Sequence, residues 1–323
     1  MTRDELLGAL VTLRRAPVRG RRAPHKPLLL LWLLGRFAAS GSTAVTYEEA
    51  EEPVGNLINE FGPAVTDPAR ARGRAAMPFV HLERELWDVR DRQAEPIPAN
   101  TPERGALLRR QGAHGRLHSR VEALLADPPT LAAAVRLLLE EHFTPALEGP
   151  ICAAVGLDTG TVAEGVPDIS VAGERRRRRA RRAGFTEEVL HAYAYACAFC
   201  GFDGALGRHP VGLEAAHVRW HSQDGPDDLS NGLALCSLHH TLLDLGVLGL
   251  LAAPPAPPGR PDQPDLRIQV SQRYVARSPA GRAVDALHGR PVTPPRPGRP
   301  AVDHAFVLWH GEQVFKHPGA QVA

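Results

Sequence analysis

Cys197-Ala-Phe-Cys200 and Cys236-Ser-Leu-His239-His240 are the two segments that decide the fold of the C-terminal half of this chain. Each segment contains potential metal ligands separated by two residues. A knuckle of this kind, closed by a second pair at the start of a helix, is how a tetrahedral structural zinc site is assembled. A redox pair is the weaker alternative because no thioredoxin-like strand surrounds the cysteines. We therefore predict a Zn²⁺ site, although spacing alone does not decide which histidine is its fourth ligand.

A second set of polar residues lies between and just after these ligand pairs. The segments are Glu214-Ala-Ala-His217-Val218 and Asn231-Gly232, and Asp244 follows His240 by about one helical turn. From about Cys197 to Leu250 the chain resembles the HNH (ββα-metal) nuclease motif. The resemblance implies a β-hairpin and a following helix that together hold one catalytic divalent ion.

The same resemblance implies a role for each matching residue. His217 is the expected general base that activates water, a role suited to an imidazole because its ordinary pKa lies near neutrality. Asn231 is expected to orient that histidine and the turn before the helix. His240 is expected to bind catalytic Mg²⁺ or Mn²⁺, which leaves the preceding residue, His239, as the fourth zinc ligand with Cys197, Cys200 and Cys236.

This sequence departs from the HNH pattern at Ala216, where many HNH enzymes carry an Asp or His that also binds the catalytic ion. Glu214 lies two residues back, on the same strand face, and is a candidate replacement. Asp244 is a second candidate. A bond from Glu214 to the backbone or to an arginine is an equally compatible role. The missing ligand leaves a weak or inactive nuclease as an alternative.

Apolar periodicity predicts a compact, mainly helical N-terminal half, so the fold class is α+β with a small zinc-stapled C-terminal domain. Thr2 and Glu5 have the spacing of a capping box at the start of the first helix. Further helices are expected at 27–37, 54–61, 116–126 and 131–143. Strands are expected at 77–82, 86–89, 266–270 and 306–309.

The first 150 or so residues resemble the sulfur-binding domain of bacterial type IV restriction enzymes that attack phosphorothioate-modified DNA. The matching segments are Pro24-His25-Lys26-Pro27, the Pro78-Phe79 pair, Glu141-His-Phe143 and Ile151 to Gly156. The resemblance implies that this half selects the target, because one ion and one base recognise only a phosphodiester.

A phosphorothioate sulfur is larger, softer and less hydrated than oxygen, so its recognition calls for an apolar dent beside cations that hold neighbouring phosphates. Met77, Pro78 and Phe79 are the candidates for the dent, with Pro27 nearby. The candidates for the positive rim are His25, Lys26, Arg72 and Arg74. For Pro27 a helix start, and for Phe79 core packing, are the competing interpretations.

The predicted organisation is a DNA-reading domain at 1–160, an Arg-rich linker at 161–184 containing Arg175 to Arg182, and the nuclease domain at 185–323. A net charge of +2 does not identify the partner. The longest apolar run, Leu28 to Leu34, is shorter than the roughly 18 residues needed to cross a bilayer, so we expect a cytoplasmic protein without membrane contact.

The leading hypothesis is a modification-dependent endonuclease that recognises phosphorothioated double-stranded DNA and cuts nearby, with a homodimer expected for cutting both strands. One alternative is an HNH nuclease of phage defence gated by methylated DNA or a second messenger. The other is a catalytically inactive, zinc-stabilised DNA-binding protein.

Overall fold

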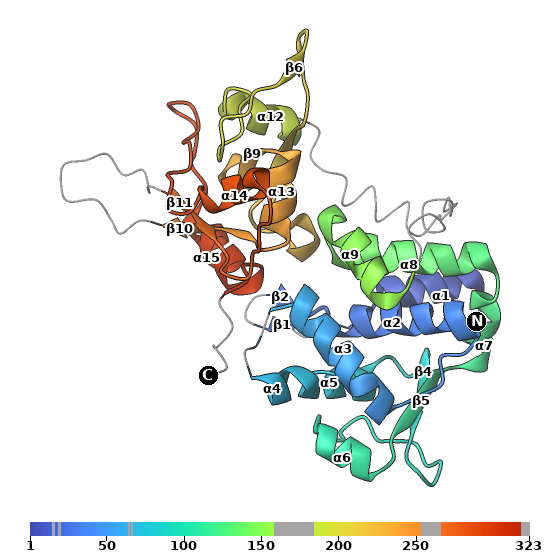
Figure 1. The fold of residues 1–323 in the computed structure, drawn as a ribbon. Helices are drawn as coiled ribbons and strands as arrows, with labels where there is room; N and C mark the ends of the chain where they lie inside the picture. The colour runs from blue at the N-terminus through green and yellow to red at the C-terminus, as the bar shows by residue number, and fades with distance from the viewer. Residues whose placement is uncertain are drawn as a thin grey trace. The chain divides into compact units, whose positions relative to one another are not determined.

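The computed structural model describes residues 1–14, 17–18, 21–63, 65, 67–157, 184–252 and 266–317. The chain divides into two compact units, Met1–Arg178 and Arg179–Ala323, which Figure 1 shows in blue to green and in yellow to red. The predicted linker at 161–184, including Arg175 to Arg182, lies outside the described residues except for residue 184. Within the described part of the chain, no helix combines the length and the apolar character that a bilayer crossing requires.

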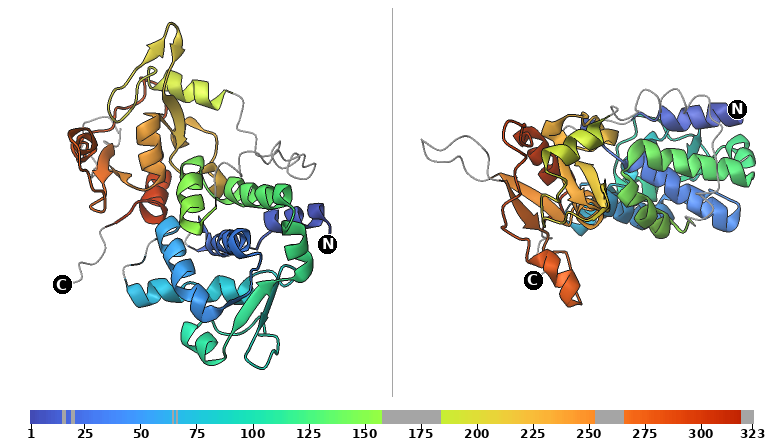
Figure 2. Two further views of the ribbon diagram at one scale, coloured as in Figure 1. Left: turned by 45° about the vertical axis from the view of Figure 1, so that its right-hand side comes forward. Right: turned by 90° about the horizontal axis from the view of Figure 1, so that it is seen from above.

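The N-terminal unit is mainly helical, as predicted. Its helices are α1 (Arg3–Val11), α2 (His25–Ser40), α3 (Tyr47–Phe61), α4 (Pro68–Gly73), α5 (Ala76–His81), α6 (Gly105–Arg110), α7 (Ser119–Leu125), α8 (Pro128–His142) and α9 (Pro145–Val155). The apolar run Leu28 to Leu31 makes α2 the buried centre. Helices α3, α5, α8 and α9 contact it, and the left view of Figure 2 shows it nearly end-on.

Short strands complete this unit. Strands β3 (Val45–Thr46), β5 (His114–Leu117) and β4 (Trp87–Arg90) form an antiparallel sheet in that order, and β1 (Pro17–Val18) pairs with β2 (Arg21–Arg22). Capping boxes start α1 at Thr2 and α3 at Thr46. The predicted first helix is therefore present, and α3 begins seven residues before the predicted 54–61 because of the Thr46 cap.

Two predictions for this unit were wrong. Residues 77–81 of the predicted strand belong to helix α5, with Ala76, Phe79 and Val80 buried at helical spacing. Pro78 is tolerated because it lies in the first turn of the helix. The backbone N–H groups of that turn have no intrahelical acceptor, so a proline there loses no hydrogen bond. The predicted helix at 116–126 is in fact the end of β5 followed by α7, since Arg116 and Leu117 pair with β4.

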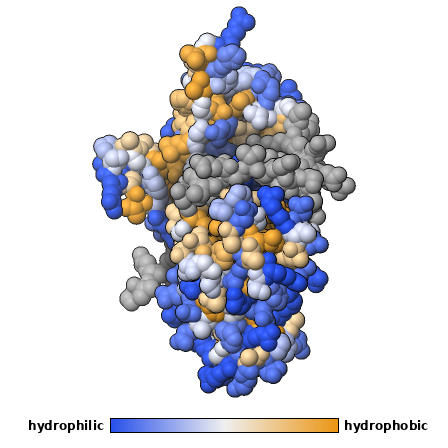
Figure 3. Space-filling model, turned by 90° about the vertical axis from the view of Figure 1, so that its right-hand side faces the viewer, coloured by the Kyte–Doolittle hydropathy of each residue, from blue (hydrophilic) through white to orange (hydrophobic). Residues whose placement is uncertain are grey.

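The C-terminal unit is built around the hairpin of β8 (Leu213–His217) and β9 (Gly232–Cys236), which is flanked by helices. Its other elements are α12 (Phe185–Ala192), β6 (Ala205–Leu206), β7 (His209–Pro210), η1 (His221–Gln223), η2 (Leu229–Asn231), α13 (Ser237–Asp244), β10 (Leu248–Ala252), β11 (Leu266–Val270), α14 (Pro279–Asp285) and α15 (His304–Gln313). Strands β10 and β11 pair antiparallel, so the strand predicted at 266–270 is present. The small hairpin β6–β7 carries exposed apolar side chains, Leu206 and Val211 among them, and hydrophobic residues are visible at the top of Figure 3.

The strand predicted at 306–309 was wrong. These residues lie within α15, which is capped at its N-terminus by Asp303, whose side chain accepts a hydrogen bond from the Ala305 N–H. Val307, His310 and Gln313 recur at helical spacing on its buried side. The short apolar run concealed this period, because four consecutive residues do not distinguish a strand from one turn of a helix.

Candidate metal and catalytic site

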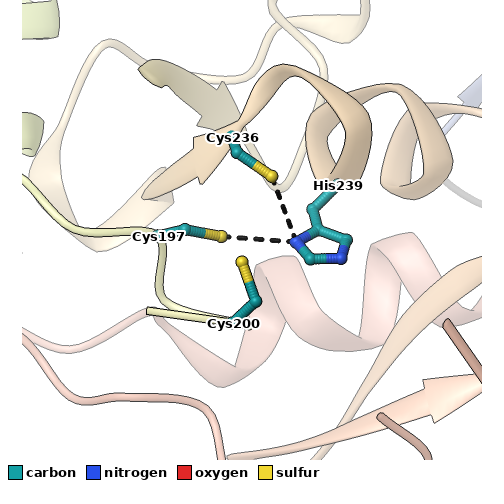
Figure 4. Close-up of side chains that lie close together, drawn as sticks. All are labelled: Cys197, Cys200, Cys236 and His239. Atoms are coloured by element: carbon teal, nitrogen blue, oxygen red, sulfur yellow. Dashed lines mark hydrogen bonds between the residues drawn. The ribbon is translucent and has the colours of Figure 1, made fainter. Parts of the chain in front are cut away.

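Four side chains converge beside the β8–β9 hairpin, as Figure 4 shows. Cys197 and Cys200 lie on the knuckle that follows α12, Cys236 ends β9, and His239 lies in the first turn of α13. One ligand atom from each lies within 4.8 Å of all the others. The His239 Nδ1 lies 3.4 Å from the Cys197 Sγ and 3.3 Å from the Cys236 Sγ. The group is therefore compact enough to close around one ion.

The surroundings of the cysteine knuckle favour the thiolate form of Cys197. Burial acts to raise the pKa of Cys197, but hydrogen bonds from His239 and from the Cys236, Cys200 and Phe199 backbone lower it to about 6. Burial raises the pKa of Cys200 to about 12. The turn itself depends on Gly201, whose φ of +78° lies in the left-handed region that favours glycine. A Cys₃His donor set in this arrangement is typical of structural zinc.

His217 ends strand β8 and lies opposite Gly232 on β9. Its imidazole ring stacks on Phe185 of α12, with ring centroids 4.5 Å apart and planes 21° apart. A Cβ at position 232 would lie 2.6 Å from the Val189 Cγ2, so only glycine lets α12 approach this closely. The hairpin and α12 thus fix the plane of the His217 ring.

Asn231 is fully buried and fastens the loop that follows β8. Its Oδ1 accepts a hydrogen bond from the Arg219 N–H at 2.8 Å. Its Nδ2 donates to the Arg219 carbonyl at 3.0 Å and to the Pro226 carbonyl at 2.9 Å. The expected orienting role of Asn231 therefore takes the form of holding this loop against the strand that carries His217.

His240 lies on α13 between two carboxylates. Its Nδ1 donates to the Glu214 Oε2 at 2.6 Å, and its Nε2 lies 3.6 Å from the Asp244 Oδ2. Ser237 Oγ donates to the other Glu214 oxygen at 2.6 Å. Each ring nitrogen of His240 therefore has one of these carboxylates beside it. Ala216, whose side chain cannot bind an ion, is buried in the same strand as Glu214.

In the N-terminal unit, the first turn of α2 lies against the segment that joins α4 to α5. The Arg74 guanidinium donates to the His25 Nε2 at 3.1 Å and to the Pro63 carbonyl at 2.6 Å. Burial, followed by the nearby charge of Arg70, lowers the pKa of Arg74 to about 10, so it stays cationic at neutral pH. Arg72 is exposed, and Met77 is half-buried.

The remaining predicted residues of this region are buried. Lys26 is 7% exposed and its Nζ lies 2.7 Å from the Glu83 Oε1, so its charge is neutralised inside the unit. Pro27 and Pro78 are buried within α2 and α5. Phe79 is fully buried, with its ring edge-on to Tyr47 and Trp87, so it packs in the core and does not line a surface dent.

Sequence reasoning missed three side chains near these sites. Asp227 and Phe185 both contact His217, and Glu83 pairs with Lys26. Asp227 is one of three aspartates between His217 and Asn231, and no spacing rule separates it from Asp224 and Asp228. A metal-binding search pattern would not have found it, because its partner is a histidine side chain rather than an ion.

Together, a Cys₃His knuckle, a ββα hairpin and a histidine at the strand end define a metal-stabilised nuclease fold. Residues 197–250 match the HNH endonuclease family, and residues 3–160 match the family described as ScoMcrA-like, DNA sulfur-binding domain. The chain therefore contains a ScoMcrA-like DNA sulfur-binding domain followed by an HNH endonuclease domain. Both resemblances inferred from the sequence are confirmed.

The chain is also similar to solved structures at low sequence identity. One described as the sulfur binding domain of SprMcrA complexed with phosphorothioated DNA is 22% identical, covers 49% of this chain and 95% of its own, and has a TM-score of 0.39. Another, the type IV phosphorothioation-dependent restriction endonuclease ScoMcrA, is 14% identical, covers 73% and 93%, and has a TM-score of 0.33. No curated protein matches the chain.

Proposed function

We propose that this protein is a restriction endonuclease that binds phosphorothioate-modified double-stranded DNA with residues 1–160 and hydrolyses a nearby phosphodiester with residues 185–323. The observation that carries the proposal is the presence of a DNA sulfur-binding domain and an HNH endonuclease domain in one chain. The solved relative ScoMcrA is described as a phosphorothioation-dependent restriction endonuclease, and a sulfur binding domain was solved with phosphorothioated DNA.

Target recognition is assigned to the region where α2 meets α5. Met77, half-buried above Pro78, supplies the apolar contact that a weakly hydrated sulfur favours. The adjacent cations are Arg72 and Arg74, which suit neighbouring phosphates and base edges, and His25 positions Arg74 by accepting its hydrogen bond. Lys26 contributes indirectly, because its pairing with Glu83 fixes the start of α2.

Hydrolysis is assigned to the hairpin and α13. His217 takes a proton from the attacking water, and Asn231 keeps the neighbouring loop in place. Glu214 and His240 would hold a divalent ion, Mg²⁺ or Mn²⁺, and Zn²⁺ would occupy the Cys₃His group. The catalytic ion, when bound, stabilises negative charge on the phosphoryl oxygens and the leaving 3′ oxygen. The products would carry 5′-phosphate and 3′-hydroxyl ends.

A homodimer is part of the proposal. One HNH site cuts one strand, so cleavage of both strands at one target calls for two sites, and a two-fold dimer matches the antiparallel symmetry of duplex DNA.

The test is cleavage of matched synthetic duplexes, one plain and one carrying a single phosphorothioate of defined stereochemistry, in Mg²⁺ and then in Mn²⁺. We expect cutting of the sulfur-containing duplex alone, and none by His217→Ala. Equal cutting of both duplexes would refute sulfur recognition. Tight binding of the sulfur-containing duplex without cutting in either metal would refute the nuclease and point to the alanine at position 216.

A further inference from the structure

The imidazole of His217 has a second partner besides the ring that stacks on it. The Asp227 Oδ1 lies 2.7 Å from the His217 Nε2, and the two side chains are only 10% and 6% exposed. A carboxylate accepts hydrogen bonds and does not donate them, so Nε2 carries the proton. The Nδ1 of His217 is then the basic nitrogen of the neutral ring.

The surroundings leave the ring little freedom. Phe185 covers one face of His217, and the ring of His221 on η1 is tilted beside it with centroids 5.8 Å apart. Asp227 and His221 are two titratable groups that lie beside the ring. A ring held on its face and bonded at Nε2 has one orientation.

Asp227 is itself held in place by the buried amide of Asn231. Asn231 Nδ2 donates to the carbonyl of Pro226, the residue before Asp227, and the Asn231 N–H donates to the carbonyl of Asp228 at 2.8 Å. The carbonyls of the residues before and after Asp227 are thus both bonded to Asn231, one by its side chain and one by its backbone N–H, and Asn231 is 0% exposed. The loop is built to present this carboxylate to the end of β8.

We propose that Asp227 is the positioning residue for the general base of this nuclease: it fixes the tautomer and orientation of His217 and stabilises the imidazolium that forms during the reaction. The inference rests on the proposed function. A water proton moves to His217 Nδ1 as the water oxygen bonds to phosphorus. The bond from phosphorus to the 3′ oxygen then breaks, and that oxygen takes a proton from solvent. Asp227 stays ionised throughout and His217 later releases its proton to solvent.

The decisive variant is Asp227→Asn in the full-length protein, assayed on the phosphorothioate duplex. The amide can donate to Nε2 and thereby place the ring proton on Nδ1, which removes the base. We expect kcat to fall by about 10²- to 10⁴-fold, the range that general-base catalysis contributes, with KM within about twofold. The acid limb of the pH profile of the residual activity should move to lower pH, because a carboxylate no longer supports the imidazolium.

Two further variants control the result. Asp228→Asn changes the exposed neighbouring aspartate and should leave kcat and the pH profile unchanged. Asp227→Glu keeps a carboxylate and should recover part of the lost rate. Zinc content and Tm are measured for each protein, since loss of either in Asp227→Asn would assign Asp227 a structural role and overturn the proposal.

The outcomes also separate this inference from the proposed function. If His217→Ala is inactive while Asp227→Asn keeps the normal kcat and pH profile, the nuclease assignment stands and the positioning role is wrong. If His217→Ala cleaves normally, the assigned base itself is wrong. A large loss of kcat in Asp227→Asn, with unchanged KM, zinc content and Tm, supports the proposal that Asp227 positions His217.

Discussion

Adjacent histidines on α13 face different groups of side chains. His239 and His240 are separated by about 100° around a helix, so their side chains leave it in different directions. His239 is 5% exposed and faces the cysteines, whereas His240 faces Glu214. Sequence spacing alone left these two assignments interchangeable, because both residues lie within one turn of Cys236. The direction of each side chain depends on the residue at which α13 begins, and the backbone conformation determines that residue.

Glu214→Ala tests how the site functions without a ligand at position 216. We expect the metal concentration for half-maximal cleavage to rise about 10- to 100-fold, because Glu214 is the carboxylate in contact with His240. The measurement is a Mg²⁺ and Mn²⁺ titration of the cleavage rate. Ser237→Ala removes only the hydrogen bond to the other Glu214 oxygen and should change the titration far less. An unchanged midpoint in Glu214→Ala would transfer the ligand role to Asp244.

The buried His310 makes the free energy of unfolding depend on pH. Burial lowers its pKa from 6.5 to about 4, although the Nε2–H donates to the Leu243 carbonyl at 3.0 Å. The unfolded chain therefore binds a proton between pH 6.5 and 4 that the folded chain does not. Stability is fully present above pH 6.5 and is lost as the pH falls through 4. The loss amounts to about 3 kcal/mol.

Urea unfolding at several pH values between 7.5 and 4 checks this prediction. His310→Gln should be less stable than the parent at pH 7.5, and its stability should fall less steeply below pH 6.5. His317→Gln is the matched control, because His317 is exposed. The Cys₃His group is common to the three proteins, so the quantity compared is the difference between them. Parallel curves for the parent and His310→Gln would contradict the assignment.

At the scale of elements, the sequence predicted helices well where a cap and a long apolar period coincide, as at Thr2 for α1. It failed where the apolar segment was short. Residues of α5 and α15 were expected to be strands, and in both the deciding information is tertiary: Phe79 packs against Tyr47 and Trp87, and His310 packs against α13. Helix α3 was predicted too short because the capping box of Thr46 and Glu49 was overlooked.

Gly232→Ala tests whether the fit of α12 on the hairpin orients the base. The added methyl group would lie 2.6 Å from Val189 and 3.3 Å from Phe185, so α12 must shift. We expect a loss of about 1–3 kcal/mol in the free energy of unfolding and a lower kcat, since Phe185 stacks on His217. Thermal unfolding and the cleavage rate measure the two effects.

Gly311→Ala provides the control within the same unit. Gly311 lies inside α15, and an added methyl group there meets nothing within 4 Å. This substitution should leave cleavage unchanged and stabilise the unit by up to about 1 kcal/mol, because alanine favours a helix over glycine. If Gly232→Ala and Gly311→Ala had the same cleavage rate and stability, α12 would be able to move away from position 232 without loss of stability, and the prediction would be wrong.

For the whole molecule, ligand spacing and short motifs identified the HNH domain, since metal coordination and phosphodiester hydrolysis restrict residue types and intervals. The sulfur-binding domain was identified only through the resemblance of short segments to a known family. The sulfur-recognition residues were harder to predict. Lys26 was expected on the positive rim but is buried and paired with Glu83, and Phe79 was expected in the dent but is in the core. Long-range pairing of this kind, between residues 57 positions apart, leaves no local pattern in a single sequence.

Zinc removal should separate the two units functionally. A structural zinc contributes about 10–16 kcal/mol in small domains, which exceeds the usual net stability of about 5–15 kcal/mol, so the C-terminal unit should unfold without it. After chelation and restoration of excess Mg²⁺, we expect no cleavage but unchanged binding of the phosphorothioate duplex in a gel-shift assay. Cys200→Ser should reproduce this result, and Cys152→Ala, a buried cysteine of the other unit, should keep its zinc and its activity. Cleavage that survives chelation would show that the Cys₃His group does not support the fold, and loss of binding would show that DNA recognition depends on the zinc-bearing unit.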